Sequence, residues 1–330
     1  MRLVTFTQDS EDRLGAVLPD GEIADLAGAA AESGFDDRPF RSMLALIEAG
    51  PAAWNSASNL AAQCPAGARV AADQVTLRAP LPLPPQIRDF MSFEKHVVQA
   101  FGAAFRMRAS RAASAEERDA LLAQAAAYRP PEAWYAQPLY YKANRFAVSG
   151  PEATIEWPAY SRLMDYECEL ACVIGRPGRD IPAERARGHI FGFTIFNDFS
   201  ARDAQAAEMA GGLGPAKGKD FDQANAFGPC IVTLDEIGDP YQLEMIVRIN
   251  GEERSRGRSG DMHWSFEQMI AHVSRGETLH AGEILGSGTV GDGCGLEHLT
   301  FLQHGDVIEL EIPGIGVLRN RIAASRGETP

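Results

Sequence analysis

Two glutamates, Glu167 and Glu169, are separated by a single residue in the largely apolar segment that runs from residue 165 to residue 174. Side chains of a strand alternate between its two faces, so both carboxylates point the same way. Two like charges about 7 Å apart on a half-buried face repel each other and resist desolvation. A hard divalent cation such as Mg²⁺, Mn²⁺ or Ca²⁺ resolves both problems, because such ions prefer oxygen ligands.

A third carboxylate, Asp198, follows the apolar run of residues 190–197. This arrangement favours a metal site built from Glu167, Glu169 and Asp198. The alternative is that one glutamate simply faces solvent at the edge of a sheet. The spacing of these residues leaves both interpretations open.

His96 is a candidate general base, because histidine titrates near neutral pH. It falls on a predicted helix, one turn after Ser92, and beside Lys95. Taken alone, the local sequence favours an ordinary surface histidine. Glu297, also taken alone, is assigned to the surface, since glutamate is rarely buried.

Arg202 and Gln205 follow Asp198 and share one face of a predicted helix, because they are three residues apart. Arginine binds carboxylates in a bidentate manner, and glutamine can donate to a carbonyl oxygen. This pair therefore predicts a binding site for a carboxylate or carbonyl group. The alternative for the neighbouring Ser200 or Asp203 is that it simply caps this helix.

Two glycine-rich segments carry further candidates. Residues 211–222 include Lys219 but are not a phosphate-binding P-loop, because Asp220 stands where that motif requires Ser or Thr. Residues 286–291 match the pattern GxGxxG, yet more glycines follow instead of a helix, so a dinucleotide site is not indicated. We expect this second loop to present backbone N–H groups and the Thr289 hydroxyl to a substrate oxygen.

Composition limits the class of partner. The chain has 330 residues, 45% hydrophobic and 23% charged, which is typical of a globular protein. Its net charge of −14 argues against nucleic acid, and no apolar segment is long enough to suggest a membrane span. Five cysteines without a CxxC pair do not indicate a disulfide framework, so a reducing cytoplasm is expected.

The hydrophobic pattern predicts the elements that must position these residues. Predicted strands are 4–7, 14–18, 169–174, 191–196, 230–234, 243–249, 307–310 and 317–319. Predicted helices are 40–49, 52–63, 92–109, 114–128, 201–209 and 265–274. The proline-rich residues 79–85 predict a boundary between a small N-terminal domain, 1–80, and a main domain, 81–330, with a helical insertion at about 106–137. So many strands with few helices exclude a doubly wound nucleotide fold.

Four motifs in order, with apolar strands between them, resemble the fumarylacetoacetate hydrolase superfamily, and the likeness covers most of residues 88–319. The motifs are Asp165-Tyr166-Glu167-Cys168-Glu169, residues 197–203, residues 218–222 and Gly286-Ser287-Gly288-Thr289. The resemblance implies an α+β, mainly β fold. Its core is a mixed antiparallel β-roll of the fumarylacetoacetase C-terminal type, with a small N-terminal β/α domain. It also implies a homodimer.

The resemblance implies roles for the candidate residues. The ligands of a divalent cation, Mg²⁺ first with Mn²⁺ or Ca²⁺ as alternatives, are Glu167, Glu169 and Asp198. The catalytic residues are His96, Glu297 and Lys219. The predicted substrate-binding residues are Arg202, Gln205, Thr289, Arg106 and Tyr141.

Two positions depart from the family pattern. The aspartate that serves fumarylacetoacetases as fourth ligand aligns with Ser92, with Asp89 three residues earlier, so water can take that place. The glutamate that acylpyruvases place three residues after the histidine is Gln99 here, whereas Glu297 matches the glutamate that fumarylacetoacetases use.

The implied activity is metal-dependent hydrolysis of a carbon–carbon bond in a 1,3-diketo acid of the fumarylacetoacetate or acylpyruvate type. The attacking water would be activated by His96 and Glu297, and Lys219 and Gln205 would stabilise the oxyanion. The same scaffold hosts decarboxylases, isomerases and hydratases of 2-oxo acids in aromatic catabolism, which are the alternatives. A non-enzymatic, metal-binding or ligand-sensing protein is a third possibility.

Overall fold

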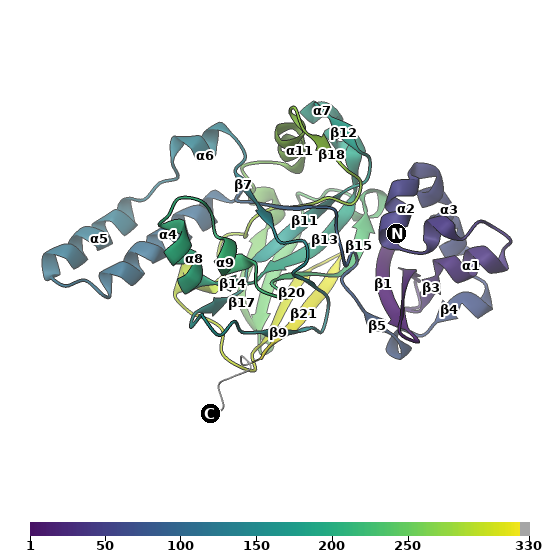
Figure 1. Cartoon of the computed structure of the whole chain (residues 1–330), viewed down its shortest axis with the longest axis horizontal. Coiled ribbons are helices and arrows are strands. Elements are labelled where there is room, and N and C mark those ends of the chain that lie inside the picture. Colours follow the sequence, from purple (N-terminus) through teal and green to yellow (C-terminus); the bar gives the residue numbers. More distant parts are fainter. Residues whose placement is uncertain (324–330) are drawn as a thin grey trace.

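The protein, a computed structural model that describes residues 1–323, is built on one large mixed sheet (Figure 1). Most neighbouring strands run antiparallel, whereas β19 pairs with β6 and β15 pairs with β8 in parallel. In sheet order the strands are β4 (Arg69–Val70), β3 (Ile23–Asp25), β2 (Glu11–Val17), β1 (Arg2–Gln8), β15 (Asn225–Thr233), β13 (Ile190–Asp198), β11 (Cys168–Ile174), β19 (Ile284–Gly286), β6 (Ile87–Phe90) and β7 (Tyr140–Ala143), with β5 (Thr76–Leu77) beside β1 and β8 (Val148–Ser149) beside β15.

A second sheet of five strands and two short strand pairs complete the β structure. The second sheet has the order β17 (Glu252–Arg258), β16 (Glu244–Ile249), β20 (Val307–Ile312), β21 (Gly316–Ala323) and β9 (Thr154–Glu156), and the short pairs are β10 (Met164–Asp165) with β14 (Ser200–Ala201) and β12 (Gly178–Arg179) with β18 (Thr278–Leu279). Apolar side chains of both sheets share one core, in which Leu170 of β11 and Leu310 of β20 are fully buried. The mixed, mainly β class expected from the sequence is confirmed.

Strand β11, which follows Glu167 directly, is buried on both faces, and the sequence had suggested a half-buried strand. Cys168 and Cys172 face the core shared with the second sheet. Ala171 and Val173, on the face of Glu169, pack in a separate apolar cluster. A strand between two cores must be almost wholly apolar, so an ionised glutamate there needs compensation.

The N-terminal segment adds strands and small helices to one end of the main sheet (Figure 1). Its helices are α1 (Leu26–Glu32), α2 (Met43–Ala49) and α3 (Pro51–Ala62), with 3₁₀ turns η1 (Arg38–Phe40), η2 (Ala66–Ala68) and η3 (Ala72–Gln74). Leu3 of β1 pairs with Ile231 of β15, and the Trp54 ring packs edge-on against Phe191, with 5.0 Å between centroids. The segment is thus joined to the main sheet, and the domain boundary near residue 80 stays a prediction.

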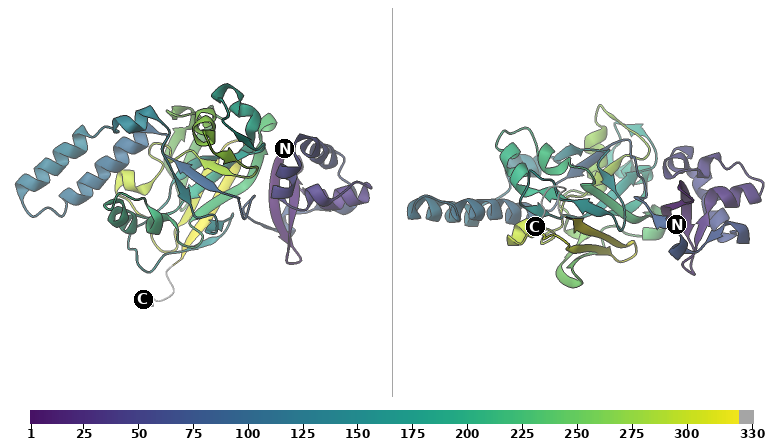
Figure 2. Two further views of the ribbon diagram at one scale, coloured as in Figure 1. Left: turned by 45° about the horizontal axis from the view of Figure 1, so that its top comes forward. Right: turned by 60° about the horizontal axis from the view of Figure 1, so that its bottom comes forward.

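Two helices, α4 (Glu94–Ala109) and α5 (Ala115–Ala127), form a hairpin that projects from the body at the end opposite the N-terminal segment (Figures 1 and 2). Helix α4 is continuous from Glu94, so the hairpin begins twelve residues before the expected insertion at 106. Tyr128 stacks on Phe101 of α4, with 5.0 Å between ring centroids and 5° between planes, which fastens the end of α5 to α4. Most residues of α5 are exposed.

The remaining helices are short. They are α6 (Glu132–Ala136), α7 (Ala183–Ala186), η4 (Arg187–His189), α8 (Arg202–Met209), α9 (Ala216–Lys219), α10 (Leu234–Ile237), η5 (Ser259–Asp261), α11 (Phe266–Ser274) and α12 (Gly295–His298). Helix α11 begins at a capping box in which Ser265 and Gln268 bond each other's backbone N–H. Within residues 1–323, no helix is both long and apolar enough to cross a bilayer.

Candidate active site

Neighbouring strands of the main sheet bring four carboxylates to one place. Glu169 lies on β11, Glu167 directly precedes it, Asp198 ends β13 beside it, and Asp89 lies on β6. Strand β19 separates β11 from β6, and its Gly286 is in register with Asp89. One oxygen from each of these four residues lies within 4.8 Å of the others, and all four residues are buried.

Glycine at two positions makes this meeting possible. A Cβ on Gly286 would lie 2.6 Å from an oxygen of Asp89 and 2.9 Å from one of Glu169, so a side chain there would separate the carboxylates. Gly288 has a φ of +79°, in the left-handed region, and its N–H donates to Glu169 at 3.0 Å. The GxG of this loop therefore shapes the acidic cluster.

The carboxylate cluster lacks donors for several of its oxygens. Oδ1 of Asp89, Oε1 of Glu169 and Oδ1 of Asp198 are buried without a hydrogen-bond partner. Burial, with the neighbouring carboxylates, raises the pKa of Asp89 and of Glu169 well above the ordinary value. Burial also raises the pKa of Asp198 to about 6, although Lys219 and Tyr141 donate to it. Buried oxygens that converge without donors are the donor set that a hard divalent cation takes.

Two buried cations sit against the cluster and neutralise only part of it. Lys219 Nζ donates to Glu167 at 2.6 Å and to Asp198 at 2.5 Å. Arg202 Nη2 forms an ion pair with Glu167 at 2.7 Å. Burial opposes ionisation of Glu167, but Arg202 and Lys219 outweigh it and lower the pKa of that carboxyl. Two positive charges against four carboxylates leave room for a divalent ion, so the residues fit the metal that the sequence predicts.

The Arg202 guanidinium is engaged on three sides. Besides Glu167, it donates through Nε to Asp165 at 2.7 Å and through Nη1 to the Gln205 side-chain oxygen at 3.0 Å. The bond to Gln205 orients that amide, so its NH₂ group is the part that can donate to a ligand. Tyr141 donates its hydroxyl to Asp198 at 2.8 Å.

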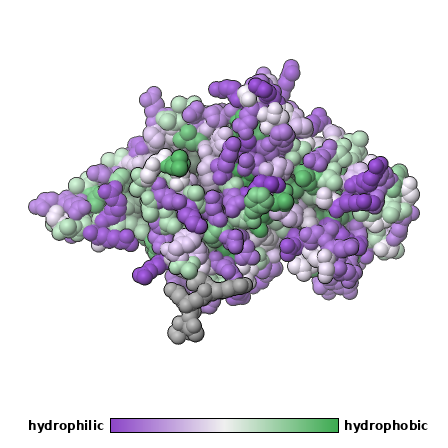
Figure 3. All heavy atoms as spheres, in the orientation of Figure 1, coloured by the Kyte–Doolittle hydropathy of each residue, from purple (hydrophilic) through white to green (hydrophobic). Residues whose placement is uncertain are grey.

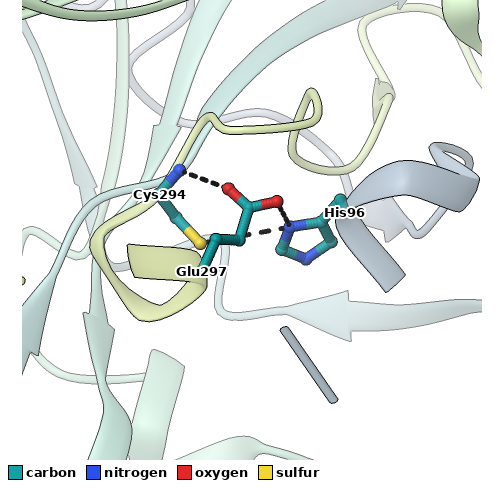
Figure 4. Close-up of side chains that lie close together, drawn as sticks. All are labelled: His96, Cys294 and Glu297. Atoms are coloured by element: carbon teal, nitrogen blue, oxygen red, sulfur yellow. Dashed lines mark hydrogen bonds and ion pairs between the residues drawn. The ribbon is translucent and has the colours of Figure 1, made fainter. Parts of the chain in front are cut away.

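His96 and Glu297 form a second buried pair close to the first cluster (Figure 4). Their Nδ1 and Oε1 atoms are 3.1 Å apart, and the other Glu297 oxygen accepts the Cys294 N–H at 3.0 Å. A carboxylate on Nδ1 holds the proton there, which leaves Nε2 of the imidazole as the basic nitrogen. The local expectation of surface positions for both residues was wrong, because α12 folds onto α4 and buries them.

Asp165 joins this pair to the carboxylate cluster. Its carboxylate accepts the N–H of Gly295 at 2.7 Å and of Leu296 at 2.9 Å, in the first turn of the helix that carries Glu297. The same carboxylate holds Arg202, which contacts Glu167. A Cβ on Gly295 would approach the Asp165 oxygen to 2.6 Å, so glycine is required there.

One cavity of about 790 Å³ connects these groups. The expected site residues that line it are His96, Tyr141, Glu167, Glu169, Arg202, Gln205, Lys219 and Thr289, together with Asp89. Glu297 lies behind His96. Arg106 is placed elsewhere, because it lies on the side of α4 that faces α12 and donates to the Glu297 carbonyl at 3.1 Å.

The structure also answers two open questions from the sequence. Asp89, not Ser92, reaches the carboxylate cluster, and the Ser92 hydroxyl donates to the Ser287 carbonyl. The expectation that the 286–291 loop offers its N–H groups to a substrate is wrong for three of them. Ser287, Gly288 and Val290 donate to Leu170, Glu169 and Cys168 within the protein. The Thr289 side chain lines the cavity.

Comparison with known sequences places the chain among related proteins. Residues 102–323 match the family model of the fumarylacetoacetate (FAA) hydrolase C-terminal domain. A protein of Pyrococcus abyssi is 37% identical over 195 residues, which are 59% of this chain and 82% of that protein. The oxaloacetate tautomerase of Bacillus subtilis is 41% identical over 160 residues, 48% of this chain and 52% of the relative. The matching region thus spans about half the length of this named relative.

Solved structures extend the likeness to nearly the whole chain. A fumarylacetoacetate hydrolase from Exiguobacterium antarcticum superposes with a TM-score of 0.73 and 30% identity, covering 98% of this chain and 99% of that one. A maleylpyruvate hydrolase from Sphingobium sp. SYK-6, in complex with manganese(II) ion and pyruvate, superposes with a TM-score of 0.71 and 25% identity, covering 99% and 100%.

Proposed function

The chain belongs to the fumarylacetoacetate hydrolase family of enzymes, and from this premise we propose that it hydrolyses a carbon–carbon bond of a 1,3-diketo acid. The substrate would be of the fumarylacetoacetate or acylpyruvate type. The observation that carries this proposal is the buried His96–Glu297 pair, whose histidine lines the same cavity as Asp89, Glu167 and Glu169 of the carboxylate cluster. Hydrolysis needs a base that takes a proton from the attacking water, and this pair can act as that base.

The proposed cation would be held by Glu167, Glu169, Asp198 and Asp89, whose buried oxygens converge. When bound, such an ion supplies Lewis-acid polarisation of the substrate's oxygens. We propose Mg²⁺ first, with Mn²⁺ or Ca²⁺ as alternatives, because all-oxygen ligand sets suit these ions. The manganese(II) and pyruvate of the Sphingobium relative support a small oxo acid beside the ion.

The chain's own residues would then perform the proton transfers. His96 accepts a proton from water at Nε2, while Glu297 holds Nδ1–H and stabilises the imidazolium. The hydroxide adds to one carbonyl carbon, and the Gln205 amide and Lys219 donate to the oxygen that becomes negative. When the carbon–carbon bond breaks, the imidazolium returns its proton to the departing carbon. The products are an acid and a ketone, so atoms and charge balance.

Tautomerisation of oxaloacetate is the second candidate, favoured by the 41% identity to the Bacillus subtilis tautomerase. Moving a proton between carbon and oxygen needs a base beside the substrate but no attacking water. His96 can serve both reactions, so the residues around it do not separate them. Products do, because a tautomerase leaves the carbon skeleton intact.

The test follows enol absorbance when the purified protein meets fumarylacetoacetate, acetopyruvate or the enol of oxaloacetate, with Mg²⁺ or with EDTA. Metal-dependent decay of a diketo acid into two fragments, identified by mass spectrometry, supports the hydrolase. Faster enol decay of oxaloacetate with no cleavage of either diketo acid would instead favour the tautomerase. Light scattering on the same sample tests the homodimer that we also propose.

A further inference from the structure

The cavity is much larger than its polar end requires. At about 790 Å³ it falls within the range of sites for drug-sized ligands, roughly 300–1,000 Å³, well beyond the space that a short oxo acid fills. Its inner end is formed by the buried polar lining residues, which are Asp89, Glu167, Glu169, Lys219, Arg202 and His96. What lines the remaining space therefore decides which substituent a substrate carries there.

One side of that outer space is an apolar wall from the projecting hairpin. Phe101, Ala104 and Met107 of α4 and Leu121 of α5 line the cavity. Phe101, Ala104 and Met107 are three residues apart in succession, so they follow one face of the helix. The stacking of Tyr128 on Phe101 holds the two helices together and fixes this wall.

The facing side is also apolar and is unusually exposed. Met209 ends α8 and Leu213 stands in the loop before α9; their exposed fractions are 46% and 98%, and both line the cavity. Gly212 and Gly214, with φ of +73° and +144°, flank Leu213 and let the loop carry it outward. Large apolar side chains left in water beside a cavity mark a binding surface. Figure 3 shows that hydrophilic and hydrophobic residues are interspersed over the face of the molecule that it presents.

The charged side chains at the rim of the cavity are exposed, so they do not favour a charged substituent deeper in the outer space. Arg108 and Arg111 are exposed and share the rim with Glu117, and Arg108 lies 5.8 Å from the centroid of the Phe105 ring. A carboxylate placed deeper, between Phe101 and Leu121, would lose its water without gaining a buried cation. An apolar group in the same place gains burial.

We propose that the space between the α4–α5 hairpin and the Met209–Leu213 segment is a subsite for an extended apolar substituent of the substrate, an alkyl chain or an aryl ring. This rests on the proposed function in one respect: the inner end must hold the oxo-acid head of the ligand. The enzyme would then act on diketo acids with apolar tails in preference to those that end in a second carboxylate.

The test measures binding, so it does not depend on which reaction the enzyme catalyses. Calorimetry on the full chain with saturating Mn²⁺ compares linear 2-oxo acids from four to ten carbons with 2-oxo dioic acids of matched length. We expect affinity for the monoacids to rise about two- to fourfold per added methylene, the gain from burying one CH₂ group. The dioic acids should show no such rise.

Paired variants locate the effect. Ala104→Asp places a charge on the exposed wall of α4 and should lower the ratio of long-chain to short-chain affinity by about tenfold or more. Ala123→Asp, on α5 outside the cavity lining, should leave that ratio unchanged. The wild-type series alone keeps the proposal testable if Ala104→Asp does not fold.

Other outcomes would overturn the inference. Tighter binding of the dioic acids would assign the outer space to a distal carboxylate read by Arg108 and Arg111. Affinity that does not change with chain length would mean that something else, such as a second copy of the chain, covers these side chains. If no 2-oxo acid of any length bound, the proposed function itself would fail at the inner end, and the subsite with it.

Discussion

The candidate active site contains two buried clusters that differ in composition and in how fully their polar atoms are paired. The first holds Asp89, Glu167, Glu169 and Asp198, and the second holds His96, Cys294 and Glu297. In each, the potential ligand atoms lie within 4.8 Å of one another. The first leaves three carboxylate oxygens without donors, whereas no atom of the second is among the unpartnered buried atoms of residues 1–323.

The difference indicates what each cluster still needs. In the second cluster both Glu297 oxygens have partners, and Cys294 Sγ accepts the Glu297 N–H as a helix cap. Its geometry is therefore complete without any ligand, as a preorganised base requires. The unpaired oxygens of the first cluster can be satisfied only by a bound cation or by protonation of the carboxyl groups. Removing a carboxylate from the first cluster should thus weaken metal binding, whereas removing His96 or Glu297 from the second should slow proton transfer.

The largest expected effect comes from the first cluster. Glu169→Gln keeps the shape of a side chain that has no cation partner while removing its charge. We expect loss of Mn²⁺ binding and a fall in kcat of about 10³-fold or more, because metal polarisation contributes several kcal/mol and each 1.4 kcal/mol is about tenfold. Calorimetry and steady-state kinetics measure both. Glu48→Gln, exposed on α2, is the matched control, and full activity in Glu169→Gln would refute the metal assignment.

The second cluster should respond differently. His96→Ala and Glu297→Gln should each lower kcat by about 10²- to 10⁴-fold, the contribution of a positioned base. Manganese affinity should change little, because neither residue belongs to the four-carboxylate set. Because the two residues act as one unit, the double variant should be scarcely slower than His96→Ala. If these variants lost metal binding as fully as Glu169→Gln does, the two clusters would not have the separate roles proposed here.

Local patterns predicted many of the strands and helices and the relative placement of residues that are close in the sequence. Alternation along residues 167–174 placed Glu167 and Glu169 on one face, and helical spacing placed Arg202 beside Gln205, which the structure joins by a hydrogen bond at 3.0 Å. The fold class followed from the family resemblance that the four motifs carry. Strand alternation and helical spacing depend on residues that are close in the sequence, so local patterns can predict them.

Features that depend on contacts between segments far apart in the sequence could not be predicted from local patterns. Asp89 joins the cluster only because β6 pairs in parallel with β19, nearly 200 residues later, with Gly286 leaving space between the carboxylates. A charged residue between Arg88 and Phe90 in a fully buried strand was the only local signal. The burial of Glu297 and the position of Arg106 depend on the packing of α12 on α4, which no spacing rule specifies.

Asp165 tests whether the two clusters are mechanically coupled. Asp165→Asn keeps the size but weakens the pair with Arg202 and replaces one acceptor of the α12 N–H groups. We expect a fall in kcat of about 10- to 100-fold, as for residues that orient a metal site from behind. As a positioning residue, it should also shift the acid limb of the kcat/KM pH profile. A merely structural role would lower the melting temperature and leave that profile unmoved.

The raised pKa values of Asp89 and Glu169 predict how metal binding depends on pH. Carboxyls with raised pKa retain protons that the cation must displace, so affinity should weaken as pH falls. The expected change is up to about tenfold per pH unit for each proton displaced. Calorimetry in two buffers of different ionisation enthalpy counts the released protons. Affinity that is constant from pH 6 to pH 8 would show that the carboxyls are already ionised before the metal arrives.

The smallest effect is expected at Cys294, which is the residue of the second cluster with no assigned proton-transfer role. Its Sγ lies 4.0 Å from His96 Nδ1 and caps α12 by accepting the Glu297 N–H. Serine is a better cap than most residues, so Cys294→Ser should preserve Glu297 and change kcat by less than about threefold. Cys294→Val, which removes the acceptor, should cost more because the helix that positions Glu297 loses its cap. If the serine variant were as slow as His96→Ala, the thiol itself would take part in the chemistry, and the second cluster would no longer be a simple histidine–carboxylate base.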